Sequence, residues 1–154
     1  MTGACQFGHV PIVQMRLDGG ARVDIANNKG ATPLYLACLK GYRKIAELLL
    51  DHGAVIDQTT IGITPLQAAC SNDHVSVVDL LIERGARINV VDPSGMTPLA
   101  FACVSGHVAT TRLLLERGSI INPQGALPIS SDFCQSCTPE IAALLREFEA
   151  RAAR

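Results

Sequence analysis

The sequence predicts an all-α repeat solenoid of helix–turn–helix units, because three kinds of residue recur at one period. The triplet Thr-Pro-Leu begins at Thr32, Thr64 and Thr97, so its copies lie 32 and 33 residues apart. Glycines that can end a second helix keep the same interval, at Gly20, Gly53, Gly85 and Gly118. Cysteines keep it too, at Cys5, Cys38, Cys70 and Cys103. Markers that stay in register over this length indicate an internal repeat.

The copy from Gly95 to Gly118 shows how one unit is expected to fold. Thr97 can cap a first helix with its hydroxyl, and Pro98 suits the first helical position because its missing N–H would be unpaired there anyway. Gly106 and Gly118 can each take the left-handed conformation that ends a helix. Spacings of three and four place three small or apolar residues on one face of the first helix, namely Leu99, Ala102 and Cys103.

These markers divide the chain into five segments. Residues 28–57 and 93–122 are complete repeats, and residues 60–89 form a repeat whose turn is one residue shorter. Residues 1–27 are a partial N-terminal repeat, either a decayed cap or the end of a longer array. Arg16 stands there where later copies have leucine, which predicts that this end is solvated. Residues 123–154 are expected to be a degenerate C-terminal repeat that caps the stack.

Two details of these copies lead to specific expectations. Asp73 occupies the helix-ending position at which Gly41 and Gly106 stand. If Asp73 is left-handed, its replacement by glycine should relieve strain and stabilise the protein by about 0.5–1 kcal/mol. In the last segment, Leu127-Pro128-Ile129 stands in place of the Thr-Pro-Leu triplet. A final helix is expected from Pro139 to near Arg151, capped by Thr138, with a polar outer face formed by Arg146, Glu147, Glu149 and Arg151.

Composition restricts the classes of partner and compartment. The net charge of −1 gives no electrostatic reason to expect nucleic acid or an acidic membrane surface as partner. The sequence shows neither an apolar run long enough for a membrane span nor a secretory signal. Six cysteines could suggest disulfides, but equivalent positions in stacked helices lie about 8–10 Å apart, too far for a bridge. We therefore expect core thiols and a cytoplasmic or nuclear protein.

The chain repeats several short motifs at this period, namely Gly-x-Thr-Pro-Leu, an Ala-Cys pair, a Gly-His or Gly-Tyr step and a Leu-Leu pair. These motifs together resemble the ankyrin repeat family. The resemblance covers about residues 1–122, with a weaker fifth copy after them. It implies a stack of helix pairs with projecting β-hairpin turns, a function in protein–protein interaction, and no enzymatic activity. The family's histidine after Thr-Pro-Leu is replaced by Tyr35, Gln67 and Ala100, so we expect the turn-to-turn hydrogen bonds to be lost and the hairpins to be looser.

Few residues indicate chemistry of their own. His9, His74 and His107 share one repeat position with Tyr42 and are interpreted as structural, because stacking would spread them along the array. The Cys134-x-x-Cys137 spacing is typical of metal or redox sites, but two further zinc ligands and a βαβ context are missing. The sequence thus predicts no catalytic, cofactor or metal residue, and no cofactor.

Partner-binding residues are expected at the positions that the family leaves variable, on the hairpin tips and on the face of the first helices. We call this set the concave strip, and it comprises Asn28, Lys29, Leu39, Lys40, Ile61, Ile63, Ser71, Asn72, Pro93, Ser94, Met96, Val104 and Ser105. Ala31 is expected to be exposed beside it. Several members are apolar without an evident packing reason, which favours a binding patch. The alternative is that neighbouring hairpins cover some of them.

The sequence therefore predicts a non-enzymatic scaffold or adaptor that binds another protein through the concave strip, as a monomer or as part of a longer chain. Three alternatives remain. The chain could inhibit an enzyme, as small ankyrin-fold inhibitors of cyclin-dependent kinases do. It could be a structural spacer within a larger ankyrin protein, or a metal- or redox-active protein based on Cys134 and Cys137.

Overall fold

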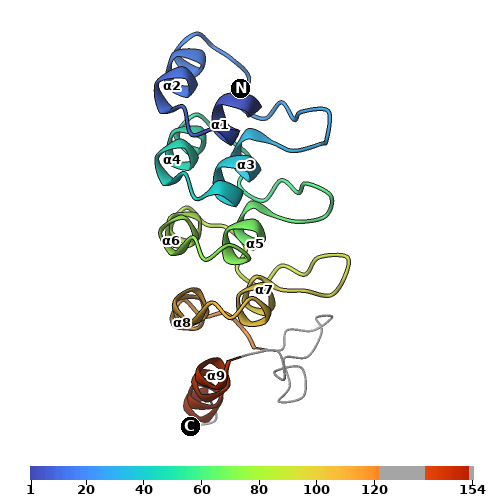
Figure 1. Ribbon diagram of the computed structural model, residues 1–154, viewed down its shortest axis with the longest axis vertical. Coiled ribbons are helices and arrows are strands. Elements are labelled where there is room, and N and C mark those ends of the chain that lie inside the picture. Colours follow the sequence, from blue (N-terminus) through green and yellow to red (C-terminus); the bar gives the residue numbers. More distant parts are fainter. Residues whose placement is uncertain (122–137, 153–154) are drawn as a thin grey trace.

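The computed structural model describes residues 1–121 and 138–152, and its elements in these ranges are helices. They are α1 (Thr2–Gln6), α2 (Val10–Asp18), α3 (Pro33–Lys40), α4 (Arg43–Asp51), α5 (Pro65–Cys70), α6 (Val75–Glu83), α7 (Pro98–Val104), α8 (Val108–Glu116) and α9 (Pro139–Ala152). Consecutive pairs stack in two rows (Figure 1). The first helices α1, α3, α5 and α7 form the inner row, beside the projecting loops, and α2, α4, α6 and α8 form the outer row. The all-α repeat stack predicted from the sequence is confirmed.

Threonine caps define where the first helices begin. The hydroxyl oxygens of Thr32 and Thr97 accept backbone N–H groups three residues on, at 3.1 and 3.0 Å. Thr64 goes further and forms a capping box, in which the Gln67 side chain also accepts the backbone N–H of Thr64 at 2.8 Å. Each cap is followed by a proline at the first helical position. The predicted role of Thr97 is confirmed, and the same device repeats in each complete copy.

The core runs along the stack between the two rows. Leu99, Ala102 and Cys103 are fully buried, which confirms the predicted inner face of their helix. The four cysteines in register, Cys5, Cys38, Cys70 and Cys103, are buried and form no disulfide with one another, as expected. Leucines and other aliphatic residues of the outer row complete the core, for example Ile45, Leu49, Leu81 and Leu114. Truncating one of these leucines to alanine would lower the free energy of unfolding by about 2–5 kcal/mol.

Rings of one repeat pack against the end of the first helix of the repeat before it, for example Tyr42 against Gly8. Gly41 has φ of +75°, and a Cβ placed on it would lie 2.5 Å from Nδ1 of His74, so the imidazole packs directly on the glycine. Nε2 of His74 also lies 3.1 Å from the carbonyl oxygen of Leu39. His107 makes the equivalent contact with the carbonyl oxygen of Ser71 at 3.2 Å. The structural interpretation of these two histidines is confirmed, whereas His9 at the end of the stack is exposed.

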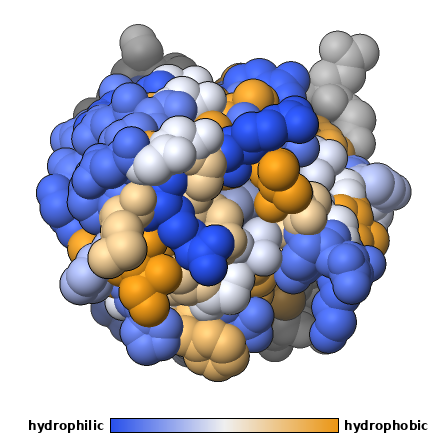
Figure 2. All heavy atoms as spheres, turned by 90° about the horizontal axis from the view of Figure 1, so that it is seen from above, coloured by the Kyte–Doolittle hydropathy of each residue, from blue (hydrophilic) through white to orange (hydrophobic). Residues whose placement is uncertain are grey.

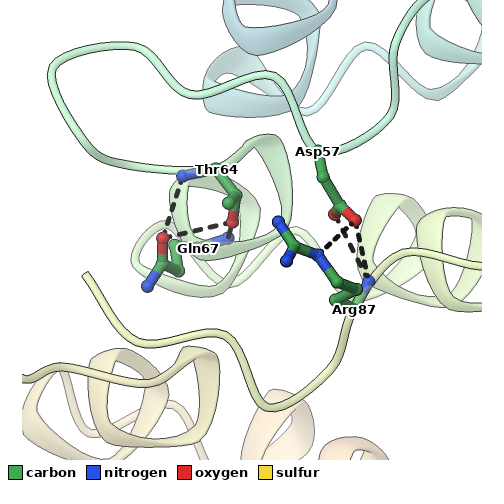
Figure 3. Close-up of polar contacts among 4 residues, drawn as sticks. All are labelled: Asp57, Thr64, Gln67 and Arg87. Carbon is green, nitrogen blue, oxygen red and sulfur yellow. Dashed lines mark hydrogen bonds and ion pairs between the residues drawn. The ribbon is translucent and has the colours of Figure 1, made fainter.

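A second set of contacts joins the loops that lead into the hairpins. Oδ1 of Asp24 accepts the backbone N–H of Val55 at 3.2 Å, and Oδ1 of Asn89 accepts that of Ile120 at 2.9 Å. Between them, Asp57 accepts both the backbone N–H and the Nε–H of Arg87, the latter at 3.0 Å (Figure 3). These bonds span 30 or 31 residues of sequence, so they hold consecutive loops at a constant offset.

The two ends of the stack differ. At the N-terminal end Arg16 is exposed, as predicted, and Figure 2 looks onto this end and shows apolar residues interspersed with hydrophilic ones. At the other end, Ile141, Leu144 and Leu145 of α9 are buried, while the predicted outer residues Arg146, Glu147, Glu149 and Arg151 are exposed. Thr138 accepts the backbone N–H of Ile141 at 3.4 Å, so its predicted cap is confirmed. Leu127, Pro128, Ile129, Cys134 and Cys137 lie outside the described residues.

Candidate functional site

Two of the three hairpins between the helix pairs are built in the same way. In the first, Oδ1 of Asn27 accepts the backbone N–H groups of Lys29 and Ala31 at 2.9 and 3.0 Å. In the third, Oδ1 of Asp92 accepts those of Ser94 and Met96 at 2.9 and 2.7 Å. The short polar side chain thus satisfies the loop's backbone donors, which stabilises the turn locally.

The middle hairpin is tighter because it has one residue fewer. Thr60 and Ile63 exchange backbone hydrogen bonds of 2.8 and 3.1 Å, leaving only Ile61 and Gly62 between them. Both central residues have positive φ, +54° for Ile61 and +80° for Gly62, as a type I′ turn requires. A β-branched residue with positive φ is strained, since its Cβ crowds the following carbonyl oxygen. The side chain of Ile61 is nevertheless 86% exposed.

Gln67 connects the middle and third turns. It is fully buried, and its Nε2 donates to the carbonyl oxygen of Met96 at 2.9 Å. Figure 3 shows its carboxamide beside Thr64, whose cap it completes. The expectation that the turn-to-turn bonds are lost is therefore wrong at this position. A glutamine has both an acceptor for its own helix start and a donor for the next repeat, so it replaces the family's histidine.

The spacing of the hairpins is uneven. A Cβ placed on Gly62 would lie 2.7 Å from ring atoms of Pro93, so the middle and third hairpins are in close contact. A Cβ placed on the corresponding Gly30 of the first hairpin would meet nothing within 4 Å. The first hairpin borders a recess of about 600 Å³, which α1, α3 and the middle hairpin also line. We call this the N-terminal recess, bounded by Gln6, Asn27, Lys29, Tyr35, Thr60 and Ile61.

A family model described as "Ankyrin repeats (3 copies)" matches residues 1–60 and 55–125, well over half of the chain. The chain belongs to the ankyrin repeat family. Members of this family generally mediate protein–protein interactions and are generally not enzymes. No helix among the described residues of this ankyrin protein is long and apolar enough to cross a membrane.

Curated ankyrin proteins match part of the chain. It is 46% identical over 54 residues to ankyrin repeat and KH domain-containing protein mask-1 of Caenorhabditis elegans, covering 35% of this chain and 2% of that protein. It is 40% identical over 58 residues to ankyrin repeat-containing protein ITN1 of Arabidopsis thaliana, covering 36% of this chain and 10% of that protein. The chain thus spans a small part of the length of these ankyrin relatives.

The ankyrin stack places the concave strip along the hairpins and the inner row, but its members are unequally exposed. Ile61 is 86% and Val104 41% exposed. The polar members at the tips and helix ends are also exposed, except Ser71, namely Asn28, Lys29, Lys40, Asn72, Ser94 and Ser105. Pro93 is exposed although it touches Gly62. Leu39, Ile63, Ser71 and Met96 are only half-exposed.

Ala31 and Met96 correct the sequence-based picture of this surface. Ala31 was expected to be exposed, but it is buried, and its backbone N–H donates to Oδ1 of Asn27 within the hairpin. Met96 packs against the core, so it is not a freely exposed side chain. Thr60 and Tyr35, which line the N-terminal recess, were not predicted as binding residues. The departure of Tyr35 from the family pattern and the shortened middle turn are the sequence signals that could have indicated this recess.

The described residues contain no group of three or more His, Cys, Asp or Glu side chains that could hold a metal ion. Burial raises the pKa of Cys5 to about 11, and it raises the pKa values of Cys38 and Cys70 further above their usual range. Because the thiolate is the reactive form, these thiols are suited to packing rather than to nucleophilic chemistry. What the described surface offers is a set of exposed loop tips, with Ile61 the most exposed aliphatic side chain among them.

Proposed function

We propose that this chain is a non-enzymatic interaction module that binds a protein partner through its hairpin tips and concave strip, with Ile61 at the centre of the contact. The proposal rests on one observation. Ile61 combines a left-handed backbone conformation with an 86% exposed side chain. Neither property favours folding, since asparagine or glycine would suit this turn better.

A partner would give this residue a role. The positive φ of Ile61 destabilises the free protein by about 1–2 kcal/mol, and its exposed side chain contributes no stabilisation from burial. Burial of the side chain against a partner would contribute about 1.5–3 kcal/mol, or at least about tenfold in affinity. An energetically unfavourable residue at a loop tip is the pattern expected where binding, not folding, determines the residue. Buried cysteines that are not bridged to one another suit a reducing compartment, and we therefore propose the cytoplasm or nucleus.

The experiment compares Ile61→Glu with a matched control. Met15→Glu places the same charge on another exposed apolar side chain, 72% exposed, in the outer row on α2. Partners are first isolated with the wild-type chain and identified, and their dissociation constants are then measured against each variant. We expect Ile61→Glu to weaken binding at least tenfold without lowering the unfolding midpoint, while Met15→Glu binds as wild type. Equal affinity of Ile61→Glu and wild type would refute the proposal.

A further inference from the structure

The N-terminal recess exists because consecutive hairpins differ in length. The first hairpin closes between Asn27 and Ala31, whereas the middle one closes between Thr60 and Ile63, one residue fewer. The shortened turn leaves the Gly30 side of the first hairpin open, while the full-length third hairpin reaches back onto Gly62. The recess therefore lies beside the shortened turn of this chain's middle repeat.

The polar groups around the N-terminal recess include several hydrogen-bond donors and one positive charge. Lys29 is the only charged residue among the described residues that line it, and none of them is acidic. Asn27 uses its Oδ1 for two backbone N–H groups, so its Nδ2 is the group left to donate to a ligand. Burial raises the pKa of Tyr35, so its phenol stays protonated and can donate. A surface of this kind is complementary to an acceptor that carries negative charge.

Thr60 has a buried hydroxyl at the edge of this recess. Its side chain lines the recess and is 4% exposed, and its Oγ1 is buried without a hydrogen-bond partner among the described residues. A buried hydroxyl without a partner costs about 1–3 kcal/mol, so such groups are rare in folded proteins. Oγ1 is buried as it stands, so the Thr60 side chain would have to rotate before this hydroxyl could meet an acceptor in the recess.

We infer that the N-terminal recess binds the carboxylate side chain of an aspartate or glutamate in an extended segment of the partner, and that Ile61 contacts an aliphatic residue next to it. The inference rests on the proposed function and specifies the partner's chemistry. Ile61 lines the same recess as Lys29, so one short segment can reach both. A lone carboxylate metabolite would use Lys29 but would leave Ile61 exposed, which is why a peptide is the ligand that fits both observations.

The test uses a phage-displayed library of random peptides panned on the folded full chain. We expect the selected peptides to contain Asp or Glu within two residues of Ile, Leu or Val. A fluorescein-labelled synthetic copy of one such peptide should lose at least tenfold in affinity when its acid is replaced by the matching amide. Selection of peptides without this acidic–aliphatic pair, or no selection at all, would overturn the inference. Equally tight binding of N-acetylglutamate amide alone would overturn its peptide part.

A charge exchange locates the contact. Lys29→Glu should weaken the acidic peptide at least tenfold, and it should bind a peptide with lysine in place of the acid more tightly than wild type does. Arg112→Glu, the same charge change at an exposed residue of α8, serves as control and should leave both affinities unchanged. Equal effects of Lys29→Glu and Arg112→Glu would show that the net charge of the protein, and not a contact with Lys29, determines the affinity, and would overturn the inference. If binding requires Ile61 but not Lys29, the proposed function stands and the recess is not its site.

Discussion

Asp73 offers a test in which the structure reverses the expectation from sequence. Its φ of +56° confirms the predicted left-handed conformation, for which glycine is normally the better residue. However, its Oδ1 also accepts the hydroxyl of Thr110, from the outer helix of the next repeat, at 2.7 Å. Thr110 is fully buried, so after loss of the carboxylate its hydroxyl would depend on water that enters the space vacated by Asp73. We therefore predict that Asp73→Gly destabilises the protein.

The magnitude follows from three contributions. Relief of the left-handed backbone would stabilise by about 1 kcal/mol. The greater freedom of glycine in the unfolded chain offsets this by about 0.5–1 kcal/mol. Loss of a hydrogen bond to a charged acceptor costs about 1.5–3 kcal/mol, toward the lower end here because the Asp73 side chain is 44% exposed. The net expectation is a loss of about 1–2 kcal/mol, opposite in sign to the gain of about 0.5–1 kcal/mol predicted from left-handedness alone.

Urea unfolding of the wild type and four variants measures this. Asp73→Asn should lie within about 0.5 kcal/mol of wild type, because asparagine tolerates the left-handed conformation and its carboxamide oxygen still accepts from Thr110. In a Thr110→Val background the hydrogen bond is already absent, so Asp73→Gly should there be neutral or stabilising. A higher midpoint for Asp73→Gly in the wild-type background, or the same change in both backgrounds, would refute the role assigned to the bond.

Three further predictions concern burial and backbone. Cys38 and Cys70 should react with a thiol reagent far more slowly in the native than in the urea-unfolded protein, and their reaction should become faster as pH rises toward their raised pKa values. Rapid labelling of the native protein at these residues, located by mass spectrometry, would contradict their burial. Thr60→Val should raise the free energy of unfolding by about 1 kcal/mol by removing an unpaired hydroxyl, whereas a lower value would mean that Oγ1 has a partner. Gly41→Ala should lower the free energy of unfolding by at least about 2 kcal/mol, because φ of Gly41 is +75° and the new Cβ would meet the His74 ring. A loss below about 1 kcal/mol, measured by thermal unfolding, would show that the ring moves aside.

The sequence by itself determined the repeat, its helices and the residues that form the core. Thr97 caps its helix within three residues of sequence, and Gly106 ends the same helix locally with φ of +76°. Such signals act within one turn of backbone, so their effect does not depend on how the repeats stack. The burial of Cys103 could also be predicted from the sequence, because helical periodicity alone assigns this residue to the inner face of its helix. The tip location of Ile61 was likewise predictable, since the shortened turn is visible in the sequence.

Only the tertiary structure decided what happens between repeats. Gln67 bonds to Met96 at a separation of 29 residues, and Thr110 bonds to Asp73 at a separation of 37. The burial of Ala31 and the opening of the N-terminal recess likewise depend on how each hairpin lies against its neighbours. These features depend on the offset and rotation between stacked units. Residue periodicity states which face of a helix is apolar, but it contains no information on which atoms of the next repeat come within hydrogen-bonding distance.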